Sequence, residues 1–276
     1  MNRIATRAET NRILKKYNFK IKRKYGQNFL IAPKIPEKIA NCGFIDKETT
    51  VLEIGPGLGA LTQFLLEKAK KVICFEVDEE LIPILKEELK EYKNFELKHQ
   101  DFMKVDLETL EIEEKTIIVT NLPYYLTSDI LVKCLNINKK IDIIAMVQKE
   151  VAKRILSSSG GKDENELTLC SKYLATTQKI IEVSKNDFSP RPKVDSTVLF
   201  FEKKENINSS AFLEIIRVLY SQRRKTLFNN LEKIIEDQEE RKKVLTNLNI
   251  DSNKRIGELK ETELTELIKN LIRRRK

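Results

Sequence analysis

A glycine-rich stretch at residues 49–59, TTVLEIGPGLG, constrains the fold more than any other part of this chain. Its apolar run, Val51, Leu52 and Ile54, is typical of a buried strand. Three glycines end that strand, because glycine lets the backbone turn with a positive φ or approach a ligand closely. The helical pattern LTQFLLEK follows, and the first N–H groups of a helix are free to bind. The sequence therefore predicts strand, tight turn and helix, with a ligand held against bare backbone. The three glycines are Gly55, Gly57 and Gly59.

The spacing of this turn indicates the kind of ligand. A dinucleotide fingerprint reads G-x-G-x-x-G, whereas these residues read E-x-G-x-G-x-G, with Glu53 ahead of the first glycine. A carboxylate here suits a cationic ligand, and S-adenosylmethionine carries an ammonium and a sulfonium group. A second predicted strand ends at Glu76, close to the offset of roughly 20 residues at which an acidic side chain meets ribose hydroxyls in nucleotide-binding sheets. The glycine turn alone is equally compatible with a plain strand-to-helix connection; Glu76 favours cofactor binding.

Composition limits the class of protein. The length of 276 residues allows one large and one small domain, and 41% hydrophobic with 34% charged residues supports a core under a soluble surface. No apolar run reaches the roughly 18 residues of a membrane span, and no secretory signal is evident. We therefore expect a cytoplasmic protein without a membrane partner. The four cysteines lie far apart and His99 is the only histidine, so we expect neither a metal site nor a Cys/His nucleophile pair.

Residues 1–27 form a basic arm. They hold nine Lys and Arg residues against Glu9 alone, while the rest of the chain is nearly neutral. Aromatic residues between the cations suit a nucleic-acid partner, since cations release counterions and aromatic rings stack on bases. A solvated charged tail is equally compatible. Just beyond the arm, Asn28 and Leu30 lie where the chain would cross the glycine turn, so we expect a loop that closes the cofactor pocket.

Polar residues end three successive predicted strands. They are Glu76, Asp101 and Asn121. The ligand crevice of an open parallel sheet lies at the carboxyl ends of its strands, so these side chains should converge on one edge. A single carboxylate after a strand is usually a turn former or a helix cap. Three polar ends in register with a glycine turn instead predict a site, in which Asp101 is the candidate acceptor for the amino group of the cofactor's adenine.

The tetrapeptide Asn121-Leu122-Pro123-Tyr124 is the most chemically specific part of the chain. An exocyclic amine on a nucleobase is a poor nucleophile, because its lone pair is delocalised into the ring. The Asn121 side-chain oxygen and the Leu122 carbonyl can accept the two amine hydrogens. Pro123 fixes the backbone that aims them, and Tyr124 offers a face on which to stack the base. An Asn-x-Pro turn beside a packed tyrosine is the structural alternative.

The remaining sequence predicts a second, helical region. A helix pattern at 78–92, an amphipathic helix LTLCSKYLATT at 167–177 and two strand patterns precede it. Phe188, between those strands, is equally compatible with the core and with a second aromatic face for the base. From about residue 207 apolar residues recur every three or four positions. We therefore expect an arm at 1–27, an α/β catalytic domain at 28–206 and a helical RNA-contacting domain at 207–276. Its RNA-contact candidates, grouped at a polar joint, are Arg223, Arg224 and Lys225.

Eight motifs now carry a resemblance to a known family. They are GQNFL (26–30), EIGPGLGALT (53–62), FEVD (75–78), QDFMKVD (100–106), NLPYYLTS (121–128), QKEVAKRI (148–155), FSPRPKVDST (188–197) and SQRRKTLFNNL (221–231). Through them the chain resembles the ribosomal RNA adenine dimethyltransferases of the KsgA type. The resemblance implies an α/β, Rossmann-like class I methyltransferase with a mostly parallel seven-stranded sheet and a small α-helical C-terminal domain. It also implies a cytoplasmic enzyme that moves four methyl groups from S-adenosylmethionine onto two adjacent adenosines near the 3′ end of small-subunit rRNA.

The resemblance assigns roles to residues of this chain. The implied cofactor-binding residues, with Gly57 added from the glycine turn, are Asn28, Leu30, Gly55, Gly57, Glu76, Asp101 and Asn121. The implied residues around the target base are Asn121, Leu122, Tyr124 and Phe188. The expected partner is small-subunit rRNA within an immature 30S-type particle, and we expect a monomer that needs no metal. Two alternatives stay open: a large-subunit rRNA or DNA adenine methyltransferase, such as the macrolide-resistance type, and a non-catalytic ribosome-assembly factor.

Overall fold

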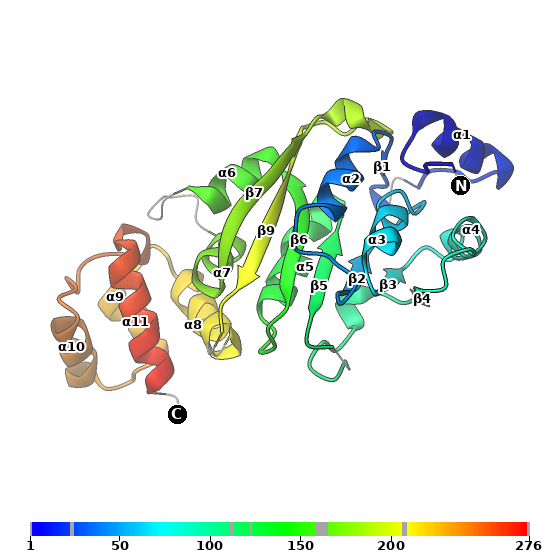
Figure 1. Ribbon diagram of the computed structural model, residues 1–276. Coiled ribbons are helices and arrows are strands. Elements are labelled where there is room, and N and C mark those ends of the chain that lie inside the picture. The colour runs from blue at the N-terminus through cyan, green and yellow to red at the C-terminus, as the bar shows by residue number, and fades with distance from the viewer. Residues whose placement is uncertain are drawn as a thin grey trace.

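A seven-stranded sheet with helices on both faces forms the centre of the molecule, and further helices lie at one end (Figure 1). The computed structural model describes residues 2–22, 25–110, 113–121, 123–157, 165–205 and 209–274. The strand order is β4-β3-β2-β5-β6-β9-β7. The strands from β4 to β6 run parallel, whereas β9 pairs antiparallel with β6 and β7. This is the α/β architecture that the sequence predicted.

The strands are β1 (Phe29–Leu30), β2 (Thr50–Ile54), β3 (Lys71–Glu76), β4 (Phe95–His99), β5 (Thr116–Thr120), β6 (Asp142–Gln148), β7 (Ala175–Val183), β8 (Phe188–Ser189) and β9 (Ser196–Lys203). The helices are α1 (Arg7–Lys16), α2 (Lys34–Ala40), α3 (Thr62–Lys68), α4 (Leu81–Glu88), α5 (Tyr124–Leu135), α6 (Lys149–Leu156), α7 (Glu166–Leu174), α8 (Ser209–Ser221), α9 (Leu227–Asn230), α10 (Gln238–Asn247) and α11 (Glu261–Arg273). β1 and β8 form a separate two-stranded sheet.

The central strand β2 sets the position of the site. All five of its residues are buried, and three of them, Val51, Leu52 and Ile54, are apolar. Ile54 at its carboxyl end lies opposite Phe75 of β3 and Thr120 of β5, so the three strands end together. The glycine turn, Glu76 and Asn121 come directly after these ends. The predicted convergence of strand ends on one edge is confirmed for these segments.

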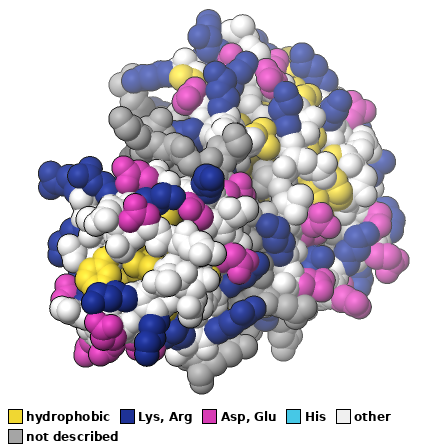
Figure 2. Space-filling model, turned by 90° about the vertical axis from the view of Figure 1, so that its left-hand side faces the viewer, with side chains coloured by type: hydrophobic (Ala, Val, Ile, Leu, Met, Phe, Trp, Pro, Cys, Tyr) yellow, Lys and Arg dark blue, Asp and Glu magenta, His cyan; other side chains and the backbone are white. Residues whose placement is uncertain are grey.

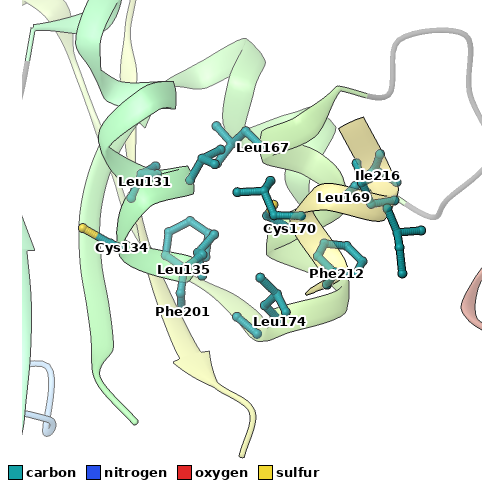
Figure 3. Close-up of a cluster of buried hydrophobic side chains, with 14 of the residues drawn as sticks. Leu131, Cys134, Leu135, Leu167, Leu169, Cys170, Leu174, Phe201, Phe212 and Ile216 are labelled. Atoms are coloured by element: carbon teal, nitrogen blue, oxygen red, sulfur yellow. The ribbon is translucent and has the colours of Figure 1, made fainter. Parts of the chain in front are cut away.

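Two hydrophobic cores fill the two faces of the sheet. One core joins α5, α7 and α8 to the sheet and continues into α11. Figure 3 shows its centre, where Leu135 of α5, Cys170 of α7 and Phe212 of α8 point toward one another. Each fully buried side chain of this size contributes about 1.5–3 kcal/mol. The C-terminal helices are therefore joined to the catalytic sheet through α8 by one continuous apolar layer.

Two predicted helices are shorter in the structure. The helix predicted at 167–177 ends at Leu174, and β7 begins at Ala175. Thr176 and Thr177 are β-branched residues that favour extended backbone, and Thr177 pairs with Phe201 of β9. The helix predicted at 78–92 is limited to α4.

The N-terminal segment packs against the sheet domain. Thr6 caps α1 by accepting a hydrogen bond from the Glu9 N–H. Ile4 and Ile13 are buried in the same core as α3 and α4, with exposed fractions of 2% and 0%. Residues 2–22 are thus a docked helix and its flanks, and the solvated-tail alternative does not describe them. No helix in the described part of the chain is long and apolar enough to span a bilayer.

Candidate active site

A cleft opens at the carboxyl edge of the sheet, where β2, β3 and β5 end. It encloses about 930 Å³, its open mouth included. Four segments meet there: the chain at 25–30, the glycine turn, the end of β3 and the start of α5. The predicted site residues that line it are Asn28, Leu30, Gly55, Gly57, Glu76, Asn121, Tyr124 and Phe188.

The glycine turn brings bare backbone to the cleft. Gly55, Gly57 and Gly59 have φ values of 69°, 61° and 87°, which L side chains rarely adopt. A Cβ on Gly57 would lie 3.3 Å from the Phe29 ring. The Gly57 N–H donates to Glu76 Oε2 at 3.3 Å. Glycine at position 57 therefore allows both the turn and the close packing of β1 over it.

Two buried carboxylates lie on the cofactor side of the cleft. Glu76 is 5% exposed, and its Oε1 accepts hydrogen bonds from the N–H groups of Val77 and Asp78, both at 2.9 Å. Burial raises its pKa, and these backbone donors counteract the rise. Glu53 is 1% exposed, and burial raises its pKa to about 7. The Cys74 thiol donates to Glu53 Oε2 with a Sγ–O distance of 3.4 Å, and in the described part of the chain no Lys or Arg forms an ion pair with this carboxylate.

These residues fit S-adenosylmethionine. A buried carboxylate without a cationic partner, Glu53, matches a ligand that carries positive charge. An oriented carboxylate at a strand end, Glu76, matches ribose hydroxyls. The apolar side chains of Val77 and Leu81 border the same cleft and match an adenine ring. Two carboxylate acceptors beside apolar side chains therefore fit a nucleoside that bears a cationic tail.

A buried latch holds the N-terminal segment across the cofactor side. Asp78 is 1% exposed, and its Oδ1 accepts from Lys22 Nζ at 2.5 Å. Asp78 Oδ2 accepts from Gln27 Nε2 at 2.9 Å, and Gln27 Oε1 accepts from the Lys22 N–H at 2.9 Å. We call Lys22, Gln27 and Asp78 the latch, and residues 25–30 the strap. The latch joins the strap to the strand end that carries Glu76.

The strap also contacts segment 121–124, which we expect to bind the target base. Gly26 has a φ of 56°, and a Cβ there would lie 2.8 Å from Pro123 Cβ. Only glycine allows the strap to pack this closely on Pro123. The Asn28 side chain donates to the Gly26 carbonyl at 2.7 Å and so stiffens the same turn. The predicted loop over the pocket is present in the structure.

Tyr124 and Phe188 are two of the aromatic residues that line the cleft. The Tyr124 hydroxyl and Ser196 Oγ are 2.8 Å apart, which links the start of α5 to the start of β9. Burial raises the pKa of Tyr124. Phe188 is 3% exposed and is positioned by its pairing with Leu30 in the two-stranded β1–β8 sheet. Within the described residues no group hydrogen-bonds the Asn121 side chain, so its amide is available to a ligand. Leu122 lies outside the described residues.

Comparison with known proteins identifies the family. A family model described as ribosomal RNA adenine dimethylase matches residues 18–273. The chain belongs to this family. Ribosomal RNA small subunit methyltransferase A of Geobacillus kaustophilus is 39% identical over 279 residues, covering 96% of this chain and 95% of that protein. The resemblance drawn from the sequence motifs is confirmed.

Solved structures agree with the adenine dimethylase family. A dimethyladenosine transferase from Plasmodium falciparum superposes with a TM-score of 0.73 and 27% identity, covering 88% of this chain and 97% of that one. The 23S rRNA methyltransferase ErmE gives a TM-score of 0.65 at 22% identity, covering 88% and 99%. The second likeness shows the fold alone. The methyltransferase fold predicted from the sequence is confirmed.

Asp101 does not reach the cleft. Its side chain accepts a hydrogen bond from the Met103 N–H at 2.9 Å, and so caps the short 3₁₀ helix Phe102–Lys104. In the described part of the chain, Asp101 is not among the residues that line the cleft. The local turn that a carboxylate commonly forms with its own backbone thus holds this side chain. That Asp101 accepts a hydrogen bond from the amino group of the cofactor's adenine stays a prediction.

The predicted RNA-contact residues lie in the turn between α8 and α9. Arg223, Arg224 and Lys225 are all exposed, and the Arg223 guanidinium lies 4.8 Å from the centre of the Tyr220 ring. Figure 2 shows the face of the molecule at the end where the C-terminal helices lie; there Lys and Arg side chains are interspersed with Asp and Glu. The role of Arg223, Arg224 and Lys225 in RNA binding stays a prediction.

Sequence reasoning missed three residues that shape the site. Gln27 and Asp78 form the latch, and Ser196 anchors Tyr124. Gln27 precedes Asn28 and Asp78 follows Glu76 by two positions, so nearness to predicted ligands was an available signal. Ser196 lies 72 residues from Tyr124, and only the sheet brings the two together.

Proposed function

We propose that the protein is an S-adenosylmethionine-dependent dimethyltransferase that converts two adjacent adenosines near the 3′ end of small-subunit rRNA to N6,N6-dimethyladenosine, with four methyl groups transferred in all. Membership of the adenine dimethylase family and similarity to a relative named for the small subunit support this. The observation that carries the proposal is that Asn121, Tyr124 and Phe188 line the same cleft as the two buried carboxylates.

Cofactor binding falls to the sheet side of the cleft. When bound, S-adenosylmethionine supplies a methyl group activated by positively charged sulfur. In the proposed site Glu76 accepts hydrogen bonds from the ribose hydroxyls. Glu53 balances the positive charge of the cofactor's tail, and Gly57 leaves room for the nucleoside. Asn28 and Leu30 of the strap cover the ligand. Water is excluded as the strap packs on Pro123.

Activation of the substrate falls to the opposite side. Tyr124 and Phe188 hold the adenine between their rings, after the nucleotide has left its stack. The Asn121 side-chain oxygen accepts one amine hydrogen, and the Leu122 carbonyl is proposed to accept the other. Two acceptors aimed at these hydrogens localise the nitrogen lone pair toward the methyl donor. No side chain is required as a general base, because the aminium product is acidic enough to lose its proton to water.

The setting of the reaction follows from its substrate. We expect the rRNA to be recognised within an immature 30S-type particle, by a monomer, in the cytoplasm. Each of the two target adenosines passes through the same pocket twice. The second transfer needs space beside Asn121 for the first methyl group.

The proposal is tested with the protein, isotopically labelled S-adenosylmethionine and under-methylated small subunits, followed by mapping of the modified bases. We expect label on two adjacent adenosines of the small-subunit rRNA. Label on large-subunit rRNA or DNA instead would support the macrolide-resistance type of activity. Cofactor binding without turnover would support an assembly factor.

The role of Asn121 is tested by Asn121→Ala. We expect kcat to fall by about 10²- to 10³-fold, as for loss of one oriented polar group around a transition state. Affinity for the small subunit should stay within about twofold, since RNA binding depends mainly on phosphate contacts. Phe44→Leu, a change at a partly buried ring outside the cleft lining, serves as the control for general damage. Unchanged turnover of Asn121→Ala would refute the assigned role.

A further inference from the structure

Two large apolar side chains are exposed at the cleft. Among the described residues, five are at least 40% exposed: Val77, Met103, Tyr125, Leu156 and Val194. Of these, Val77 and Tyr125 line the cleft, whereas Met103 lines a separate hollow and Leu156 ends α6. Single exposed apolar residues are ordinary, but an exposed aromatic ring beside a proposed base pocket suits contact with the substrate.

Tyr125 is the most exposed of the five. Its side chain is 58% exposed and directly follows Tyr124 of the cleft. A Cβ on Gly26 would lie 3.4 Å from Tyr125 Cε1, so the ring rests against the strap. The contact with the strap restrains one part of the ring while much of it remains accessible. A restrained and accessible aromatic ring next to a base pocket suits stacking on a further base.

The loop at 189–195 presents cations at the same rim. Its two ends are fixed to the cleft, through the pairing of Phe188 with Leu30 and through the contact of Ser196 with Tyr124. Arg191 and Lys193 in this loop are exposed. Within the described residues, neither Arg191 nor Lys193 forms an ion pair, since no carboxylate lies within 4.0 Å of either.

The acidic residues next to this loop are already engaged. Asp195 Oδ1 accepts from the Lys185 N–H at 2.9 Å, and Asp187 lies 3.9 Å from Lys34 Nζ. Loop 189–195 holds two cations, Arg191 and Lys193, and one carboxylate, Asp195, so it carries a net charge of +1 beside Phe188. An RNA chain continues on both sides of a splayed-out nucleotide, so its phosphates must cross the rim of the pocket that holds the base.

We propose that Tyr125 and loop 189–195 bind the single-stranded RNA that flanks the target adenosine. Tyr125 stacks on a neighbouring base, and Arg191 and Lys193 neutralise the adjoining phosphates. This surface rests on the proposed function and adds to it a recognition site at the rim of the catalytic pocket, which Tyr125 also lines. It explains why exposed apolar and unpaired basic residues occur together at this rim.

Stacking is tested with a short single-stranded oligoribonucleotide that carries 2-aminopurine beside an adenosine. Stacking on an aromatic ring quenches 2-aminopurine fluorescence. We expect quenching with the wild-type protein and with Tyr125→Phe, which keeps the ring. Tyr125→Ala should lose the quenching and bind the oligonucleotide about tenfold more weakly, as expected for one lost base–aromatic stack. Equal quenching by Tyr125→Ala and wild type would overturn the stacking role.

The phosphate contacts are tested with the double variant Arg191→Ala/Lys193→Ala. For single strands the slope of log affinity against log salt changes by about 0.7 for each phosphate contact, so the slope should flatten by about 1.4. The matched control is Lys68→Ala/Lys93→Ala, which removes two exposed lysines from segments at the amino edge of the sheet. The control should keep the wild-type slope. Equal slopes in the two double variants would overturn the phosphate role.

Methyl transfer separates failure of this surface from failure of the proposed function. With under-methylated small subunits, both rim variants should raise KM by about tenfold or more while kcat and affinity for S-adenosylmethionine stay within about twofold. If the wild type is active and the rim variants keep its KM, the proposed RNA-binding surface is wrong and the proposed function is unaffected. Wild type that transfers no methyl group would overturn the function, and the oligonucleotide measurements would then decide the surface alone.

Discussion

The N-terminal segment and the turn between α8 and α9 are both rich in Lys and Arg, but their cations have different surroundings. Arg12 and Lys16 of α1 pair with Glu88 of α4, and Lys22 pairs with the buried Asp78. The turn instead exposes its cations, and Arg224 and Lys225 have no acidic partner within 4.0 Å in the described chain. The same composition thus holds the N-terminal segment and the strap against the sheet in one region and leaves exposed charges in the other.

This difference teaches how a basic stretch should be interpreted. The charge of a segment says little until the acidic residues that fold against it are known. Compensated and buried charges should make the cofactor side sensitive to pH and to loss of single partners. Uncompensated and exposed charges should make the α8–α9 turn sensitive to salt. Four measurements test this difference between the N-terminal segment and the α8–α9 turn.

The largest effect is expected for Asp78→Ala. Lys22 and Gln27 lose their shared acceptor, and Lys22 keeps only the more exposed Glu80, 3.0 Å away. Removal of one partner of a buried ion pair costs up to about 3–5 kcal/mol. The strap should loosen, so that affinity for S-adenosylmethionine falls by about tenfold or more, while RNA affinity is retained. Chemical denaturation and calorimetric titration measure the two effects. Asp78→Asn, which keeps one oxygen acceptor, is the control and should lose less. Unchanged cofactor affinity in Asp78→Ala would show that the latch does not act on the cofactor.

A pH effect of nearly the same size is expected from Glu53. Burial raises its pKa from 4.5 to about 7, so between these pH values the folded state binds more protons than the unfolded state. Stability of the ligand-free protein should therefore fall as pH rises through this window, by on the order of 3 kcal/mol in total. Glu53→Gln removes the titrating group and should flatten this part of the curve. Denaturation at several pH values measures it, and parallel curves for the two proteins would contradict the prediction.

A smaller effect is expected at the α8–α9 turn. Replacing Arg223, Arg224 and Lys225 with alanine should weaken small-subunit binding by about tenfold and flatten its salt dependence by about one unit of slope per lost phosphate contact. Stability should change by less than about 0.5 kcal/mol, as is usual for surface substitutions. Binding titrations across a salt series measure the slope. A slope equal to that of wild type would leave these residues as ordinary solvated charges.

The smallest effect is expected for Arg12→Ala. Its side chain is 40% exposed, and Glu88 keeps Lys16 and Tyr17 as partners when Arg12 is removed, so we expect a loss of about 1 kcal/mol or less. The salt slope of RNA binding should not change. Arg224→Ala is the matched arginine-to-alanine comparison, because it should change the slope and leave stability unaltered. A flattened slope in Arg12→Ala would break the contrast, since it would place RNA on the N-terminal segment as well.

Local patterns in the sequence predicted the sheet, the glycine turn and the edge at which Glu76 and Asn121 meet. These features depend on residues close together in the chain. The packing of residues 2–22 depends on Glu88 and Asp78, which lie more than 50 positions away, and no local pattern indicates such partners. Asp101 shows the effect of a local partner, because its Oδ1 accepts a hydrogen bond from the nearby Met103 N–H; its assignment to the cofactor stays a prediction.

Phe188 shows how a distant contact decides between two local interpretations. The sequence was equally compatible with a core residue and with a base contact. The structure gives it both properties, since it is buried and also lines the cleft. Its position depends on pairing with Leu30, which sequence reasoning did not foresee. Contacts of this kind form only when the whole sheet is assembled.

The two-residue ladder between β1 and β8 limits which changes of chain length the protein can tolerate. Successive side chains of a strand point to opposite faces, so inserting or deleting a single residue beside Leu30 or Phe188 would turn the phenylalanine ring away from the base pocket. Surface connections elsewhere accept such changes at low energetic cost. Length variants at these two strands should therefore abolish methylation while the chain still folds.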